Sequence, residues 1–194
     1  VVARAWPSTK EAYQVHMGKV PSGEPRGMDE TVEALAVLFK KFPQLDTGLV
    51  IGGAPCQPFS ALNADRLGWD DERAAGIGDF GNLVLRCVQA TRRASLRIEW
   101  DAMLENVGSM KPEDRATITS EVSKIYKPVL YMFDAGEIGP QSRNRLYWCS
   151  WEAVLGDLDC IPEEDFIRVK NNGSRPTAHV FLEPGVKKVS PFKK

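Results

Sequence analysis

Short apolar runs alternate with helical patterns along most of this chain, and that alternation limits the folds open to it. Strand-like runs are expected at residues 49–51, 102–104, 129–133 and 146–148. Between the first two runs, apolar residues from Phe80 to Val88 recur at helical spacing. Pro112 and the two acids after it mark the start of another helix. Strands that alternate with helices predict an α/β fold with a mostly parallel sheet.

The remaining patterns are weaker. We expect a strand over residues 1–5, a helix over 9–17, a loop over 21–27 and a helix over 28–42 that ends at Pro43. Residues 61–78 read as a polar, mobile loop, and the chain after Trp151 reads as irregular and punctuated by prolines. Residues 1–150 are therefore predicted to form the core, and residues 151–194 a smaller region with a basic tail.

Composition fits a soluble globular protein with one good-sized core, since 43% of the 194 residues are hydrophobic and 26% are charged. No apolar run approaches the roughly 20 residues that cross a bilayer. The first residues do not resemble a signal peptide, and because no initiator Met is present we expect an excerpt of a longer protein. The four cysteines lack C-x-x-C spacing, which argues against a disulfide framework or a zinc site and favours a reducing, intracellular compartment.

Three polar strings follow the apolar runs: GAPCQPFS from Gly53, LENV from Leu104 and QSRNR from Gln141. In α/β sheets, ligands bind at the carboxyl ends of the strands. Cys56 and Glu105 each come just after a strand, and the stretch between them leaves room for one crossover helix. We therefore expect both side chains in one cleft, on neighbouring parallel strands.

These residue types suit the activation of a pyrimidine ring. A cysteine can add to a ring carbon, a carboxyl can protonate a ring nitrogen, and an arginine can hold an exocyclic oxygen. Arg143 and Arg145 alternate, so both should point to one face of an extended segment. Each residue alone also has a structural interpretation: a buried apolar thiol, a capping carboxylate or a surface ion pair.

Taken together, the three strings resemble the core motifs of the DNA cytosine-5 methyltransferases. The resemblance runs from Val1 to about Trp148. The FDAGE string at 133–137 and the short stretch after Arg145 look most like the de novo branch of that family. The resemblance implies a Rossmann-like fold of the S-adenosylmethionine-dependent methyltransferase type, present here as an incomplete doubly wound sheet. It also implies S-adenosylmethionine as cofactor and double-stranded DNA as partner.

The resemblance assigns roles to individual residues. Cys56 would add to C6 of a cytosine that has been flipped out of the duplex, because stacking hides that atom. Glu105 would contact N3 and the exocyclic amine of the base. Arg145, with Arg143, would hold the base O2 and the loop around the thiolate. C5 of the ring would then accept the methyl group.

The chain departs from the family pattern around the cofactor. It has no match to the opening Gly-rich loop, and Ala5 stands where an acid normally binds the ribose. Trp6 could still pack on the adenine, Asp29 is the candidate for its amine, and the resemblance also places Pro55 in this pocket. The family's last motifs are missing beyond Lys194. Truncation, a second polypeptide that completes the fold, or a non-catalytic relative would each explain this, and we expect the chain alone to be inactive.

Other functions also fit parts of the sequence. The chain could be an inactive DNA-binding or regulatory relative, or one half of a split enzyme. A thiol hydrolase that pairs Cys56 with His16 or His179 is disfavoured, because neither histidine lies in a motif that would place it. A zinc deaminase is disfavoured because the second cysteine and the His-x-Glu partner are absent.

The end of the chain is locally basic although the net charge is −1. Residues 170–194 hold six lysines and arginines against Glu183 alone, a balance that favours phosphate contacts. We expect this tail to position a duplex and residues 151–179 to read bases. A solvated terminus explains the charge equally well. The compartment would be the nucleus in a eukaryote, and the cytoplasm or nucleoid in a bacterium or phage.

Overall fold

The structure, a computed structural model, describes residues 18–19, 25–139, 141–152, 158–171 and 173. The predicted strand over residues 1–5 and helix over 9–17 lie outside the described residues. β1 (Gly18–Lys19) and β2 (Pro25–Arg26) form a short antiparallel pair. The prediction of an unbroken loop over residues 21–27 was therefore wrong at its end, because backbone pairing extends into it.

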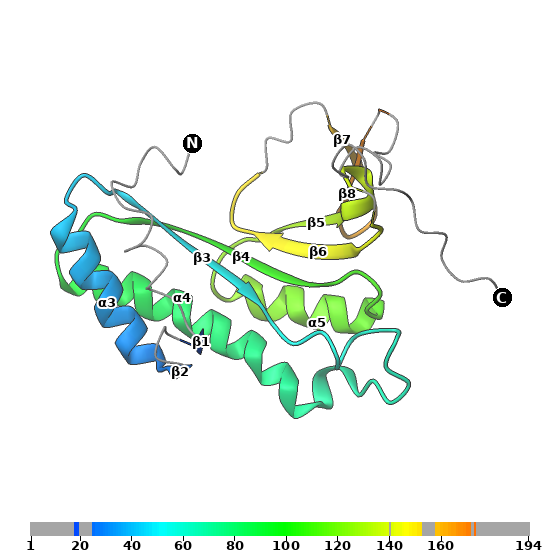
Figure 1. The fold of residues 1–194 in the computed structure, drawn as a ribbon, viewed down its shortest axis with the longest axis horizontal. Coiled ribbons are helices and arrows are strands. Elements are labelled where there is room, and N and C mark those ends of the chain that lie inside the picture. Colours follow the sequence, from blue (N-terminus) through cyan, green and yellow to red (C-terminus); the bar gives the residue numbers. More distant parts are fainter. Residues whose placement is uncertain (1–17, 20–24, 140, 153–157, 172, 174–194) are drawn as a thin grey trace, which may run out of the picture.

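The main sheet has six strands in the order β3-β4-β6-β5-β8-β7 (Figure 1). They are β3 (Thr47–Gly53), β4 (Glu99–Val107), β5 (Val129–Asp134), β6 (Asn144–Cys149), β7 (Leu158–Pro162) and β8 (Ile167–Asn171). β3 pairs in parallel with β4, as the sequence predicted, and β5 pairs in parallel with β8. β6 runs antiparallel to β4 and β5, and β7 antiparallel to β8. β3, β4, β5 and β8 thus share one direction, which confirms a mostly parallel α/β sheet.

Three helices pack on one face of this sheet: α3 (Met28–Lys41), α4 (Ala75–Arg93) and α5 (Pro112–Ser123) (Figure 1). Their ends follow helix electrostatics, since α3 has acids in its first turn and lysines in its last, and α5 begins with Pro112 and two acids. Apolar side chains from the helices meet the sheet in one core cluster, whose fully buried members include Phe59, Leu104, Ile118 and Trp148.

Two segments expected to be irregular contain regular structure. The loop after Cys56 holds two 3₁₀ turns, η1 (Gly68–Asp70) and η2 (Glu72–Ala74), and α4 begins at Ala75 rather than after residue 78. Beyond residue 157, β7 and β8 form a hairpin. Arg115 of α5 holds the tip of that hairpin, because its Nε donates to Asp165 Oδ2 at 2.8 Å and its guanidinium stacks on the Phe166 ring.

Gly52 near the end of β3 leaves room for a core side chain. A Cβ built there would lie 2.5 Å from Cδ2 of Phe80, a buried ring of α4. We expect Gly52→Ala to lower the free energy of unfolding by about 1–3 kcal/mol, because the packed ring has to move. Urea denaturation measures this change. Gly78→Ala is the control, since no atom lies within 4 Å of a Cβ at that helical position. Equal unfolding midpoints for both variants would contradict the packing argument.

Candidate active site at the carboxyl edge of the sheet

Cys56 lies in a tight turn three residues after β3. Its carbonyl oxygen accepts hydrogen bonds from the backbone N–H groups of Phe59, at 3.1 Å, and Ser60, at 2.9 Å. Phe59 is fully buried in the core, whereas Cys56 is half-buried and Pro55 exposed. The buried phenylalanine anchors the turn, and half-buried Cys56 packs against the edge of the core.

Glu105 and Arg145 form an ion pair at the same edge of the sheet. Arg145 Nε lies 2.6 Å from Glu105 Oε1, and their side chains are only 16% and 27% exposed. In the strand register Val107 faces Arg145 and Tyr147 faces Glu105, so the pair is a diagonal cross-strand contact. A partly desolvated, charge-assisted contact of this kind fixes both groups.

The carboxylate of Glu105 also reaches the end of β3. Gly53 is paired with Glu105 in the parallel ladder, and a Cβ on Gly53 would lie 3.2 Å from Glu105 Oε2. The neighbouring side chain, fully buried Asn106, donates from Nδ2 to the carbonyl oxygen of Ala54 at 3.4 Å and accepts from the N–H of Val107 at 2.7 Å. Asn106 therefore ties the end of β4 to the segment that leads into Cys56.

The two arginines of the third string differ in their surroundings. Arg145 lies within β6, whereas Arg143 precedes the strand and is exposed. Only Arg145 of the two lies in β6, and the prediction that both point to one face of an extended segment stays a prediction. Tyr147, which the sequence analysis missed, borders the pair. Burial raises the pKa of Tyr147, and the charge of Glu105 raises it further, while Arg145 and Arg143 lower it.

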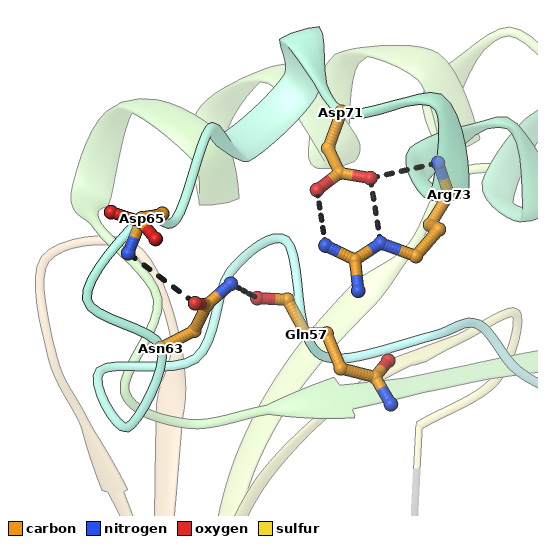
Figure 2. A network of polar contacts seen from close by, with 5 residues as sticks. All are labelled: Gln57, Asn63, Asp65, Asp71 and Arg73. Atoms are coloured by element: carbon orange, nitrogen blue, oxygen red, sulfur yellow. Dashed lines mark hydrogen bonds and ion pairs between the residues drawn. The ribbon is translucent and has the colours of Figure 1, made fainter.

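Hydrogen bonds organise the loop that follows Cys56 (Figure 2). Asn63 Nδ2 donates to the carbonyl of Gln57 at 2.9 Å, and Asn63 Oδ1 accepts from the N–H of Asp65 at 3.3 Å. Further along the loop, Arg73 donates two hydrogen bonds to the carboxylate of Asp71, from Nε at 2.8 Å and from Nη2 at 2.6 Å. These bonds and the backbone N–H of Arg73 lower the pKa of Asp71 to about 2, so the pair is ionised at neutral pH.

Ser109, which no sequence pattern singled out, connects this loop to the sheet. Its Oγ accepts from the backbone N–H of Ala61 at 3.1 Å, and its carbonyl accepts from Arg66 Nη1 at 3.1 Å. Gly108, one residue earlier, donates from its N–H to the carbonyl of Asn144 at 3.1 Å. The turn after β4 thus contacts both the Cys56 loop and the start of β6.

The four cysteines differ in accessibility. Cys87 and Cys149 are buried, and burial raises the pKa of each to about 11. Cys56 is half-buried and Cys160 is exposed.

We expect iodoacetamide at pH 8 to label Cys56 and Cys160 in the folded protein and to spare Cys87 and Cys149. A thiol with a pKa near 11 is only about one part in a thousand ionised at that pH. Peptide mass spectrometry reads the labelled positions, and labelling in urea, which should modify all four, is the control. Folded-state labelling of Cys87 as fast as that of Cys160 would contradict the burial.

The predicted cofactor residues are not gathered in one place by the described part of the chain. Trp6 lies outside the described residues. Asp29, in the first turn of α3, forms an ion pair with Arg86 of α4 in a groove of about 350 Å³ between these helices. Pro55 is exposed at the end of β3 and packs near Gly76, where a Cβ would lie 3.1 Å from its ring.

Among the residues that the structure describes, no helix has the length and apolar character that a membrane crossing requires.

Comparison with known proteins gives the family. A model of C-5 cytosine-specific DNA methylases matches residues 1–177. The type II methyltransferase M1.ScrFI of Lactococcus lactis subsp. cremoris is 29% identical over 143 residues, which cover 71% of this chain and 31% of that protein. A crystal structure of a Spodoptera frugiperda DNMT2 mutant is 20% identical with a TM-score of 0.39, covering 78% of this chain and 43% of that one. The chain spans less than half of either protein. Because the family model matches most of its residues, the chain belongs to the C-5 cytosine-specific DNA methylase family.

Proposed function

We propose that the protein containing this chain transfers a methyl group to C5 of cytosine in double-stranded DNA through a covalent Cys56 adduct. The observation that carries the proposal is the Glu105–Arg145 ion pair of 2.6 Å at the carboxyl edge of the sheet, beside the strand that leads into Cys56. Family membership over residues 1–177 supports the choice of cytosine C5.

The chemistry follows from the polarity of the base. Addition of the Cys56 thiolate to C6 pushes electron density toward N3. The Glu105 carboxyl can donate to N3 only after it has taken up a proton; in its ionised form it accepts a hydrogen bond from the exocyclic amine. Arg145 fixes that carboxyl and can hold the O2 of the base. C5 then becomes nucleophilic enough to bond to the methyl group, and the donor would leave as a neutral thioether. A base from solvent, water or hydroxide, takes the C5 proton, the electrons of that bond re-form the C5–C6 double bond, the Cys56 thiolate leaves and the N3 proton returns to Glu105.

The base has to leave the duplex first, because C6 is hidden in the stack. The basic residues of 170–194 are proposed to hold the phosphates, and of these the structure describes Lys170, which is exposed on β8. Phosphate contacts release counterions, so DNA affinity should fall steeply with salt. Two other basic residues, Arg92 and Arg93, end α4. They therefore lie at the opposite edge of the sheet from Glu105.

S-adenosylmethionine is the proposed methyl donor and, when bound, supplies an electrophilic methyl group. Of the residues expected to hold it, Pro55 is accessible at the carboxyl end of β3, which suits a ligand. Asp29 fits less well, because its carboxylate is engaged by Arg86. The 194 residues also offer no Gly-rich loop, and Ala5 carries no carboxylate.

We therefore expect the isolated 194-residue chain to bind S-adenosylmethionine only weakly and to be inactive by itself. Ribose hydroxyls buried without an acceptor lose on the order of 1–3 kcal/mol of binding free energy. Isothermal calorimetry of the isolated chain should show no saturable binding at micromolar cofactor. A dissociation constant in the micromolar range or below would refute this expectation.

Mass spectrometry of nucleosides tests the proposed function. The full-length protein is incubated with DNA and S-adenosylmethionine carrying a deuterated methyl group, and the DNA is then hydrolysed. The proposal expects the label in 5-methylcytosine. A label on the exocyclic nitrogen of cytosine or adenine, or no label with full-length protein that binds DNA, would reject it.

A further inference from the structure

One carboxylate closes the turn between β5 and β6. Asp134, the last residue of β5, accepts at Oδ1 from the backbone N–H of Gly136, at 2.9 Å, and of Arg143, at 2.6 Å. Its Oδ2 accepts from the hydroxyl of Ser142 at 2.7 Å. The N–H of Ala135 also donates to the carbonyl of Arg143 at 3.2 Å. Asp134 therefore binds both the beginning and the end of this turn.

The ladder between the strands does not hold Ser142 and Arg143. Its last pair joins Asp134 to Asn144, and Phe133 faces Arg145 one step inward. Besides the backbone bond from Ala135 to the Arg143 carbonyl, the two residues before β6 are held by Asp134, and hydrogen bonds to an ionised carboxylate are stronger than neutral ones. Gly136 is closely packed in this turn, since a Cβ there would lie 3.2 Å from both Asp134 Oδ1 and the Cα of Ser142.

The strand register at the loop end of the β5–β6 pair determines where the side chain of Arg145 lies. A slip of one residue in a strand turns every side chain to the opposite face of the sheet. Arg145 reaches Glu105 only in the observed register, in which it lies between Val107 and Phe133. Because Asp134 fixes the segment two residues before Arg145, it fixes the register at the end where that arginine lies.

We propose that Asp134 is a positioning residue, which holds the Ser142–Arg143 turn and thereby keeps Arg145 aligned on Glu105. The catalytic consequence rests on the proposed function, whereas the effect on the turn does not. The two consequences can be measured separately.

The same turn offers a matched control. Glu137, nearly buried, accepts at Oε2 from the backbone N–H of Asn171 at 3.1 Å, and its carbonyl accepts from Asn171 Nδ2 at 2.8 Å. Asn171 ends β8, so Asn171→Ala loosens the other side of the turn and leaves every Asp134 bond in place.

Limited proteolysis with trypsin tests the turn in the full-length protein, because trypsin cuts after Arg143. Cleavage of a native segment tracks its local opening. Asp134→Ala should speed this cut by about tenfold or more relative to the cut after Arg115. Asp134→Asn, which keeps an oxygen for the two N–H groups, should stay within about threefold of wild type, as should Asn171→Ala. Ser142→Ala, which removes one bond of three, should lie between and serves if Asp134→Ala does not fold.

Covalent trapping of DNA containing 5-fluorocytosine tests the catalytic consequence. Asp134→Ala should slow trapping by roughly 10–100-fold with unchanged DNA affinity, and Asp134→Asn should restore the rate. Unchanged cleavage after Arg143 in Asp134→Ala and Ser142→Ala would overturn the role in the turn. Faster cleavage with undiminished trapping would overturn the alignment of Arg145. If wild type traps no DNA, the proposed function fails, while proteolysis still decides whether Asp134 holds the turn.

Discussion

Cys56→Ser should lower methyl transfer by the full-length protein at least about 10⁴-fold, because a hydroxyl cannot replace a thiolate in the addition to C6. The change removes no packing volume of consequence, so DNA affinity and the unfolding midpoint should stay near the wild-type values. Single-turnover rates with radiolabelled S-adenosylmethionine measure the loss.

Cys160→Ser is the control for this variant. Cys160 is exposed on β7, the edge strand on the opposite side of the sheet from β3 and β4, and the rate of this variant should equal that of wild type. A Cys56→Ser protein that retains a tenth or more of the wild-type rate would remove Cys56 from the mechanism.

Arg145→Leu should have the second largest effect. It takes the guanidinium partner away from Glu105, whose side chain is only 27% exposed in the native pair, and it removes the group proposed to hold the base O2. Loss of one such electrostatic contact in a reacting site typically costs about 10²–10³ in rate. We expect a fall of that size in the single-turnover rate, with a smaller change in the affinity for cofactor.

Arg143→Leu separates the role of the pair from that of charge alone. Arg143 carries the same charge two residues earlier, but its side chain is exposed and lies before β6. Its replacement should lower the rate less than tenfold and act mainly on DNA affinity. Equal losses of rate in the two variants would show that the Glu105 contact is not what distinguishes Arg145.

The elements around the site could be predicted because local patterns determine them. β3 and β4 are apolar runs that end in glycine or polar residues, and α5 starts with a proline followed by acids. The start of α4 was missed because Ala75, Gly76 and Gly78 look like a loop, whereas Gly76 is small so that the helix can approach Pro55.

β7 could not be read from its own residues, whereas β8 alternates apolar and polar residues from Ile167 to Lys170, a strand signal that was missed. Most of β7 is exposed and does not alternate between polar and apolar residues. The hairpin is held by contacts to distant segments: Arg115 binds Asp165, and Phe166 lies within 5.3 Å of the guanidinium groups of Arg115 and Arg168. Such contacts leave no periodic signal in the sequence.

Within the site, the sequence pointed to the groups proposed to react and missed the residues that hold them. Cys56, Glu105 and Arg145 stand out because thiol, carboxyl and guanidinium groups follow apolar strands. Asn106 and Ser109 bond to backbone groups of segments about 50 residues away, as the separations of 52 and 48 residues show. A single sequence carries no sign of a partner that is defined only by the folded chain.

If Cys56 bonds to C6 of the target cytosine, peptide mapping of a trapped complex should locate that bond. The full-length protein is reacted with S-adenosylmethionine and a duplex containing 5-fluorocytosine, digested with nuclease and protease, and examined by mass spectrometry. We predict that the nucleotide is attached to the peptide that contains Cys56 and to no other. Attachment to Cys87, Cys149 or Cys160, or a stable adduct in Cys56→Ser, would contradict the account.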